Sequence, residues 1–399
     1  MEKQDRRPPD VAKLPAPSAV GERLNSLDTY RGLTMILLAF TVPNYDWAAR
    51  IATKHTDAPL LARFLRQFDH VEWQGLVLWD MIQPSFMFMV GVSLVYSCNS
   101  RLRRGHSFAR MLFHAVFRSI FLVLLGVFLR SLDTESTNWT YEDVVTQIGL
   151  GYVPLFLLWR GGRIVQLSAL AVILVGTWLL FALWPITPEN TGFYNDFFAH
   201  WNITGNPWQY VDQWFLNLFP RDERFVANDD GYYTLNFIPS IGTMIFGLLA
   251  GNVLYQHLMA SVKLRQLLTW GGVALATGVL LEVAGICPIV KKIWTPSFVL
   301  VSGGICLWTL AILYYCVDML NWDRISFPAR VVGMNSMAMY IMVHTTAGWL
   351  ARNLETHLGT KFFALWGNAY QPLFINLTVG VCLWLICFWM YKRQIFLRI

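Results

Sequence analysis

The chain of 399 residues is 55% hydrophobic and 15% aromatic, while only 14% of its residues are charged and its formal net charge is +6. Soluble domains carry about 25% charged residues, and the mean hydropathy of +0.42 is too apolar for a water-soluble fold of this length. These values exclude a disordered chain, a coiled coil and an ordinary cytosolic enzyme. They predict an all-helical, polytopic membrane protein, in which each helix needs roughly 20 apolar residues to cross the bilayer.

The N-terminal segment differs in composition from the rest of the chain. Residues 1–24 are polar and contain prolines among Lys and Arg, without the apolar core of a signal peptide. We expect a flexible cytoplasmic tail over 1–24 and a single transmembrane domain over 25–399.

Apolar segments in the remaining sequence predict a bundle of ten transmembrane helices, with two long outer loops at 50–76 and 185–236. The predicted spans are 31–49, 77–98, 112–130, 144–159, 164–184, 237–256, 266–286, 297–317, 331–350 and 372–391. If both termini are cytoplasmic, most of the 31 Lys and Arg residues fall on the inner side, as the positive-inside rule requires. We therefore predict a multi-pass protein of a bacterial inner membrane, surrounded by lipid, with no nucleic-acid partner.

The beginning of the first span carries side chains suited to an anion. Ser26 and Asp28 are residue types that cap a helix N-terminus. Arg31 follows at the inner interface, where an Arg beside a helix N-terminus suits a phosphate. Anchoring of Arg31 to lipid headgroups is the alternative interpretation. At the other end of this span, Pro43 is expected to break the helix and to place Asn44 at the outer cavity, although a simple turn is also consistent with the sequence.

The second span begins with the most informative stretch of the sequence. His70 is placed at the outer face, and His is the side chain whose ordinary pKa suits a base near neutral pH. Asp80 is costly inside a span unless it is paired or lines a cavity, and Pro84 should free a backbone carbonyl one turn earlier. These residues indicate a polar cavity at the outer end, although an interfacial His bonded to backbone or lipid is the alternative.

Polar residues in three later segments are further candidates. Gln147, near the outer end of the short fourth span, either joins helices or contacts a ligand. Lys291 and Lys292, placed outside, run against the charge rule and invite an anion site, with Trp294 next to them. In the ninth span a polar stripe at helical spacing either joins helices or lines a cavity; its members are Asn335, Ser336, Tyr340 and His344.

Several common catalytic signatures are missing from the sequence. There is no P-loop, GxSxG, HExxH, dinucleotide-binding or CxxC motif. The six cysteines lie in or beside apolar segments without metal-ligand spacing, so we expect them to act as apolar fillers and expect no metal site.

Six motifs in order resemble the heparan-α-glucosaminide N-acetyltransferase family and its bacterial relatives. They are S-L-D-T-Y-R-G-L at 26–33, the run from His70 to Gly91, Q-I-G-L-G-Y at 147–152, I-P-S-I-G-T-M-I-F-G-L-L-A-G at 238–251, I-W-T-P-S-F at 293–298 and G-M-N-S-M-A-M-Y at 333–340. The resemblance implies transfer of an acetyl group from cytoplasmic acetyl-CoA to an amine of an amino sugar or glycan on the outer side. A homodimer is expected by analogy.

The resemblance also implies roles for individual residues. His70 would be the catalytic base or an acetyl carrier, and Asn44 would assist it. We expect acetyl-CoA to contact Ser26, Asp28, Arg31, Gln147, Asn335 and Ser336, and the acceptor to contact Trp73, Asp80, Trp294 and His344.

Two departures from the family pattern limit this interpretation. The loop between Asn44 and His70 is longer than in the family, and Ile148 stands where the family has an Arg. An exporter or transporter of a small polar molecule, or a non-catalytic scaffold on the same fold, are the alternatives.

Overall fold

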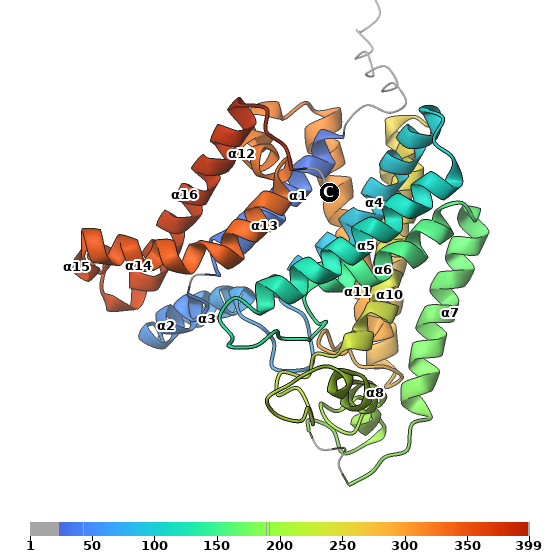
Figure 1. The fold of residues 1–399 in the computed structure, drawn as a ribbon, viewed down its shortest axis with the longest axis horizontal. Coiled ribbons are helices and arrows are strands. Elements are labelled where there is room, and N and C mark those ends of the chain that lie inside the picture. The colour runs from blue at the N-terminus through green and yellow to red at the C-terminus, as the bar shows by residue number, and fades with distance from the viewer. Residues whose placement is uncertain (1–23, 43, 189, 191, 398–399) are drawn as a thin grey trace, which may run out of the picture.

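The computed structural model describes residues 24–42, 44–188, 190 and 192–397. Among these residues there are helices and no strand, apart from one isolated bridge between Gln74 and Val290. The all-helical prediction is therefore confirmed. The predicted tail lies outside the described residues except for Leu24, and so does Pro43. The helices form two groups, with α1 and α12–α16 on one side and α4–α7 and α9–α11 on the other (Figure 1).

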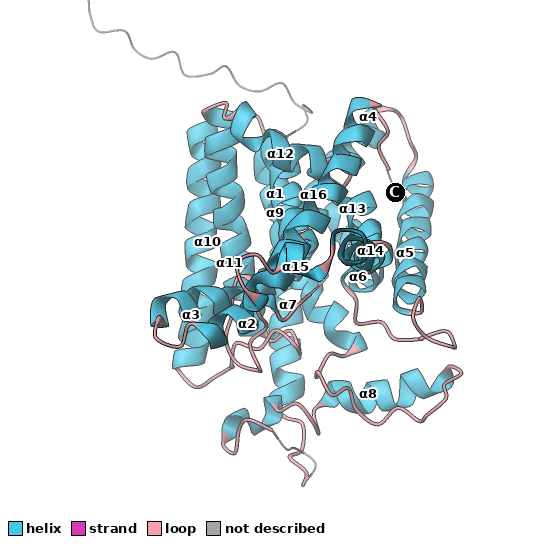
Figure 2. Ribbon diagram, turned by 90° about the vertical axis from the view of Figure 1, so that its left-hand side faces the viewer, coloured by secondary structure: helices cyan, strands magenta, loops and turns pink. Residues whose placement is uncertain are grey.

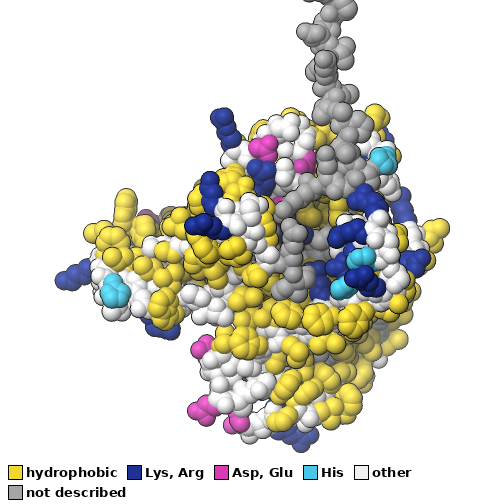
Figure 3. Space-filling view, turned by 45° about the horizontal axis from the view of Figure 1, so that its top comes forward, with side chains coloured by type: hydrophobic (Ala, Val, Ile, Leu, Met, Phe, Trp, Pro, Cys, Tyr) yellow, Lys and Arg dark blue, Asp and Glu magenta, His cyan; other side chains and the backbone are white. Residues whose placement is uncertain are grey.

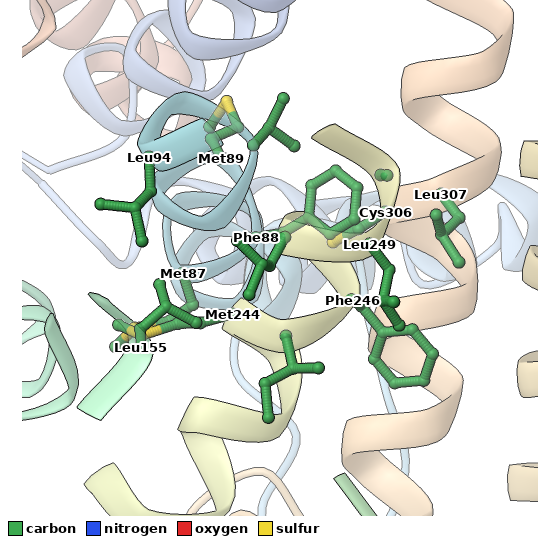
Figure 4. Close-up of a cluster of buried hydrophobic side chains, with 14 of the residues drawn as sticks. Met87, Phe88, Met89, Leu94, Leu155, Met244, Phe246, Leu249, Cys306 and Leu307 are labelled. Carbon is green, nitrogen blue, oxygen red and sulfur yellow. The ribbon is translucent and has the colours of Figure 1, made fainter. Parts of the chain in front are cut away.

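The larger group packs around the crossing of α4 and α9. Gly91 of α4 and Gly247 of α9 let the two backbones touch, since a Cβ atom on Gly247 would lie 1.9 Å from the carbonyl oxygen of Phe88. Side chains of α4, α6, α9 and α11 fill the space around this crossing (Figure 4). The helices of this group are α4 (Ile82–Arg103), α5 (Phe108–Arg130), α6 (Val144–Trp159), α7 (Gly162–Ala182), α9 (Phe237–Tyr255), α10 (Ala260–Val283) and α11 (Pro296–Leu313), the last continued by the π-helical turn η6 (Tyr314–Met319).

The smaller group is built around α1 and α12. These two helices also touch through glycine, because a Cβ atom on Gly333 would lie 1.8 Å from the carbonyl oxygen of Asp28. The helices are α1 (Asn25–Ala39), α12 (Asp323–Gly333), α13 (Ser336–Thr345), α14 (Ala347–Leu358), α15 (Thr360–Phe363) and α16 (Gln371–Lys392), with the short η7 (Asn368–Tyr370) before α16.

Seven helices among the described residues are long and apolar enough to cross a membrane, and α6 is a shorter apolar helix. The membrane prediction is thus confirmed, but two of the ten predicted spans are wrong as continuous helices. The span 31–49 ends at Ala39, where the hydroxyl of Thr41 donates to the carbonyl oxygen of Leu37 at 2.6 Å. The span 331–350 is divided among α12, α13 and α14. The first break lies at Asn335. The side-chain amide of Asn335 donates to the carbonyl oxygen of Ile395 and accepts from the backbone N–H of Leu397.

The two long loops fold into a layer of their own, here called the outer layer. It contains α2 (Trp47–Lys54), α3 (Pro59–Leu65), η1 (Arg66–Phe68), η3 (Phe197–Trp201), α8 (Pro207–Phe215), η4 (Leu216–Leu218) and η5 (Thr234–Asn236). Figure 2 shows α8 beyond the lower ends of the long helices. Part of the layer has a buried aromatic core that includes Trp73, Trp201 and Trp208. The loops are therefore packed structure rather than free linkers.

The opposite end of the bundle, here called the basic face, collects cationic helix ends. Arg101 and Arg103 end α4, Arg160 follows α6 and Arg163 begins α7. Figure 3 shows Lys and Arg side chains gathered around a hollow at this end. By the positive-inside rule such a cluster is typical of a cytoplasmic side, and the sidedness of the chain stays a prediction.

Candidate active site

His70 lies in the loop between η1 and the short helix η2 (Trp79–Met81), at the junction of the outer layer and α4. A second loop, between α10 and α11, is tied to it. The amide of Gly75 donates to the carbonyl oxygen of Ile289 at 2.9 Å, next to the bridge between Gln74 and Val290. This contact holds Lys291 beside His70, although the two residues are 221 positions apart.

His70, Asp80 and Lys291 form a compact charged cluster. Nδ1 of His70 lies 2.7 Å from Oδ1 of Asp80, and Nζ of Lys291 donates to the same oxygen at 3.2 Å. The Asp80 side chain is 1% exposed, whereas the His70 side chain is 44% exposed. A buried carboxylate thus receives one bond from a buried ammonium and one from a ring that faces outward, and this pairing compensates the cost of burying it.

The hydrogen bonds fix the tautomer of His70. The indole N–H of Trp79 donates to Nε2 at 3.0 Å, so Nε2 carries the lone pair. In the neutral ring Nδ1 then carries the proton and donates it to Asp80. Lys291 Nζ lies 3.3 Å from Nδ1, but a protonated Nδ1 cannot accept from it, so Lys291 bonds Asp80. The arrangement is a histidine oriented by a carboxylate, with the ring lone pair on Nε2.

Lys291 is a further functional candidate. Its only signal in the sequence was a predicted position on the outer side, where the positive-inside rule disfavours Lys. Burial lowers the pKa of its ammonium below the usual value, while the nearby Asp80 opposes this shift. Tyr232 covers the cluster, with the ammonium nitrogens of Lys291 and Lys292 lying 5.7 and 5.9 Å from its ring centre. The pairing with Asp80 had no sequence signal, because the two residues meet only through the contact between loops.

A cavity enters the bundle from the basic face. It has a volume of about 470 Å³ and is lined by side chains of α1, α4, α5, α6 and α13. A second cavity of about 300 Å³ adjoins it, because both include Ser97 and Arg118 in their walls. The second cavity adds the cationic side chain of Arg101 and the ring of His114. Together they form an apolar chamber with a basic opening, here called the inner cavity.

Arg118 of α5 stands out among the cavity residues. Its guanidinium lies 4.7 Å from the ring centre of Tyr152 and donates to the Tyr152 hydroxyl at 3.3 Å. Its Nε atom is buried and has no hydrogen-bond partner in the part of the chain that the structure describes. Ile148 lines the same cavity. A cation from a neighbouring helix therefore stands close to the position where the family pattern expects an Arg.

A buried apolar cluster connects the inner cavity to His70. Met35, Val145 and Tyr340 line the cavity and belong to the same buried cluster as Trp79. Trp79 in turn contacts the His70 ring. The inner cavity and His70 are therefore linked through side chains of one cluster.

Comparison with known proteins finds relatives over most of the chain. No family model matches the chain. The chain is 25% identical to human heparan-alpha-glucosaminide N-acetyltransferase over 433 aligned positions, which cover 96% of the chain and 61% of the human protein. The mouse protein of the same name is 24% identical, with 94% of the chain and 60% of that protein covered. Over most of its length the chain is thus similar to heparan-alpha-glucosaminide N-acetyltransferases. It spans about three fifths of the length of these relatives.

The fold does not bring the side chain of Asn44 to His70. The amide nitrogen of Asn44 donates to Oδ1 of Asn376 on α16 at 2.9 Å, and the Asn376 amide returns a bond to the Asn44 carbonyl at 3.0 Å. The neighbouring Tyr45 does contact the site, since its ring centre lies 6.3 Å from that of Trp79. Asn44 thus stands beside the site with its amide turned to α16.

Of the residues expected to contact acetyl-CoA, Asp28, Arg31 and Ser336 line the inner cavity. Arg31 bonds Asp28 and Ser93. The prediction that Ser26 or Asp28 caps the first helix is wrong, because α1 begins after Leu24 without a side-chain cap. Instead, the carboxylate of Asp318 accepts from the Ser26 amide at 3.4 Å. The N-terminus of α1 therefore already faces an anion, which disfavours a phosphate there.

Gln147 and Asn335 do not line the described inner cavity. The Gln147 amide donates to the carbonyl oxygens of Tyr141 and Thr234 at 2.7 and 3.0 Å, and thereby fastens the start of α6 to the outer layer. The Asn335 amide donates to the carbonyl oxygen of Ile395 at 3.0 Å and fastens the C-terminal segment. Both side chains are buried and hold the backbone, since backbone groups outside helices need partners.

The residues that were expected to contact the acceptor bond other parts of the protein instead. Trp73 is 1% exposed and donates to the carbonyl oxygen of Trp201, inside the outer layer. Trp294 is packed in the core and donates to the hydroxyl of Thr243. The ring of His344 lies 4.3 Å from that of Tyr340, tilted by 31°, and its Nδ1 bonds the Tyr340 carbonyl. Asp80 is bonded by the His70 ring and by Lys291, so it does not present a free carboxylate.

Proposed function

We propose that the protein is a membrane-embedded acetyltransferase that takes acetyl from acetyl-CoA at the basic face and delivers it to an amine of an amino sugar or glycan on the outer side of a bacterial inner membrane. The observation that carries the proposal is the position of Trp79, which contacts the His70 ring and shares one buried cluster with residues that line the inner cavity. This places a cavity with arginines in its walls and an oriented histidine on either side of one apolar cluster. The homodimer expected by analogy stays a prediction.

The inner cavity fits an acyl donor of this chemistry. Phosphates require cations, and Arg31, Arg101 and Arg118 line the cavity walls. The buried Nε of Arg118, which has no partner among the described residues, is a donor available to a ligand. The apolar walls deeper in the chamber, including Met35 and Val145, suit an extended and weakly polar arm.

In the proposed reaction Nε2 of His70 takes the proton that the amine loses as its nitrogen bonds the acetyl carbon. The carbon–sulfur bond breaks, and the proton passes to the departing thiolate. Asp80 stabilises the imidazolium through Nδ1, and Lys291 keeps Asp80 ionised. In the two-step alternative Nε2 bonds the acetyl carbon while the carbon–sulfur bond breaks and coenzyme A leaves as the thiolate. The amine then attacks the acetyl carbon, the bond between Nε2 and that carbon breaks, and the proton that the amine loses passes through Nε2 to the thiolate. Either route requires Trp79 to release Nε2, so the indole is a positioning residue that substrates displace.

Asn44 is proposed to donate to the oxygen that becomes negative in the transition state. Its amide must then exchange the bond to Asn376 for one to the substrate. Tyr45, in contact with Trp79, links this exchange to the movement of the indole.

The test uses the full chain in proteoliposomes, with labelled acetyl-CoA supplied at the basic face and glucosamine as acceptor. The expected result is acetylated amine that falls by about 10³-fold in His70→Ala, while coenzyme A still shifts the melting temperature of that variant. His357→Ala, an exposed histidine of α14, is the matched control and should keep activity. Counterflow of unmodified sugar without any transfer would contradict the proposal and favour a transporter.

A further inference from the structure

A third cavity at the basic face is not used by the proposed reaction. It has a volume of about 460 Å³ and lies among the end of α6, the start of α7, the end of α9 and the start of α10. Two arginines, Arg160 and Arg163, are among its described lining residues, and no Asp or Glu is. Several side-chain amides join them; these are Asn99, Gln166, Asn252, Gln256 and Gln266. The lining therefore favours an anion with several hydrogen-bond acceptors.

The two arginines are held in place by aromatic rings. The guanidinium carbon of Arg163 lies 4.5 Å from the ring centre of Trp270, and that of Arg160 lies 5.2 Å from that of Phe108. A guanidinium stacked on a ring keeps its N–H groups free to donate in its own plane. Behind them Gln166 is fully buried and accepts from the amide of Asn252 at 3.0 Å. Ring contacts and hydrogen bonds therefore fix the positions of the arginines and of the side-chain amides in this polar cavity.

An apolar groove continues from this cavity. The groove has a volume of about 290 Å³ and shares Arg163, Leu249 and Trp270 with the polar cavity. Its other walls are aliphatic or aromatic except for Thr277, and they come from α7, α9, α10 and α11. Both α7 and α10 pack on α9, and α7 stands at the edge of the bundle (Figure 1). Large apolar side chains of α7 and α10 are exposed along the groove, including Leu167 and Val273.

We propose that this composite site binds an anionic phospholipid of the leaflet at the basic face, with its phosphate between Arg160 and Arg163 and one acyl chain in the groove. The combination of a cationic head compartment and a contiguous apolar groove matches an amphiphile. A free phosphate would use only the first of the two. A zwitterionic lipid would fill the groove but would bring an ammonium toward two arginines. Anionic lipids of the cytoplasmic leaflet supply the required charge at this face.

The proposal is tested by native mass spectrometry of the purified full chain, titrated with phosphatidylglycerol or with phosphatidylcholine of identical acyl chains. The wild type is expected to bind phosphatidylglycerol more tightly. R160Q/R163Q should weaken phosphatidylglycerol binding by about tenfold and leave phosphatidylcholine binding unchanged. The matched control R324Q/R393Q removes two exposed arginines of the same face outside the site and should change neither.

A second variant separates the lipid from a free anion. Thr277→Trp fills the groove without changing charge, and it should weaken the binding of both lipids. Glycerol 3-phosphate at millimolar concentration should not displace phosphatidylglycerol from the wild type. Equal losses in R160Q/R163Q and R324Q/R393Q would overturn the proposal, because attraction would then be general. Displacement by glycerol 3-phosphate, or unchanged lipid binding in Thr277→Trp, would overturn the acyl-chain part.

Discussion

The two ends of the bundle are built on different physical principles. At the basic face the inner cavity is roomy, and its charges come from long arginine side chains on apolar walls. At the outer end polar atoms of His70, Asp80 and Lys291 lie within 3.3 Å of one another, so these side chains have little freedom to move. The first arrangement suits a large ligand that enters and leaves, and the second suits a proton transfer that needs a fixed geometry. In the proposed function, binding and chemistry are therefore separated by depth, with Trp79 between them.

The largest effect is expected from a substitution of Asp80, which would disrupt the fixed geometry of the outer end. Asp80→Asn leaves the ammonium of Lys291 buried without its counterion, so we expect a loss of about 3–5 kcal/mol of stability. Activity should fall by about 10²-fold because the imidazolium loses its partner. Denaturation in detergent and initial rates measure the two effects.

A double variant separates these two consequences. D80N/K291M removes both charges, so it should recover most of the lost stability while activity stays low. Recovery of activity together with stability would show that Asp80 serves the fold alone.

At the outer end two buried carboxyl groups make the stability of the fold depend on pH. Burial raises the pKa of Glu142, in the loop between α5 and α6, to about 7 against the attraction of Arg130, and it raises the pKa of Asp212 in α8 to about 6. A carboxyl whose pKa is raised in the folded state keeps its proton while the unfolded chain has lost it. Stability should therefore fall as the pH rises from about 4.5 to about 7, by about 3 kcal/mol for Glu142.

The check is the melting temperature of Glu142→Gln across this pH range. The variant should lose most of the slope, whereas Glu135→Gln, an exposed carboxylate before α6, should keep it. An unchanged slope in Glu142→Gln would mean that this carboxyl is ionised throughout.

The smallest effect is expected at the inner cavity. Arg118→Gln should raise the KM for acetyl-CoA by about tenfold with little change in kcat, because the lost contact is made equally in the ground and transition states. Arg324→Gln, an exposed arginine of α12, is the control. A fall in kcat at constant KM would instead place Arg118 near the reacting atoms and would weaken the separation of binding from chemistry.

The amino-acid sequence by itself determined the class of the protein. Apolar runs separated by polar loops leave a bundle of membrane helices as the way to satisfy the backbone in lipid. Local sequence also placed His70 and Asp80 near one another, because only ten residues separate them at the start of one span. The sequence also placed Arg31, Asp28 and Ser336 correctly at the inner cavity. These residues lie near helix ends at or close to the basic face, and such positions can be read from the sequence.

Tertiary structure decided the partners of these residues. Lys291 reaches Asp80 because two loops pair at Gln74 and Val290, and Arg118 reaches the inner cavity because α5 packs on α6. Gln147, Asn335 and Trp73 resembled ligand contacts in the sequence, yet they bond backbone carbonyls that were exposed by breaks and loops elsewhere in the chain. A polar side chain in an apolar segment must find a partner, but whether that partner is a ligand or the protein's own backbone depends on contacts between residues far apart in sequence.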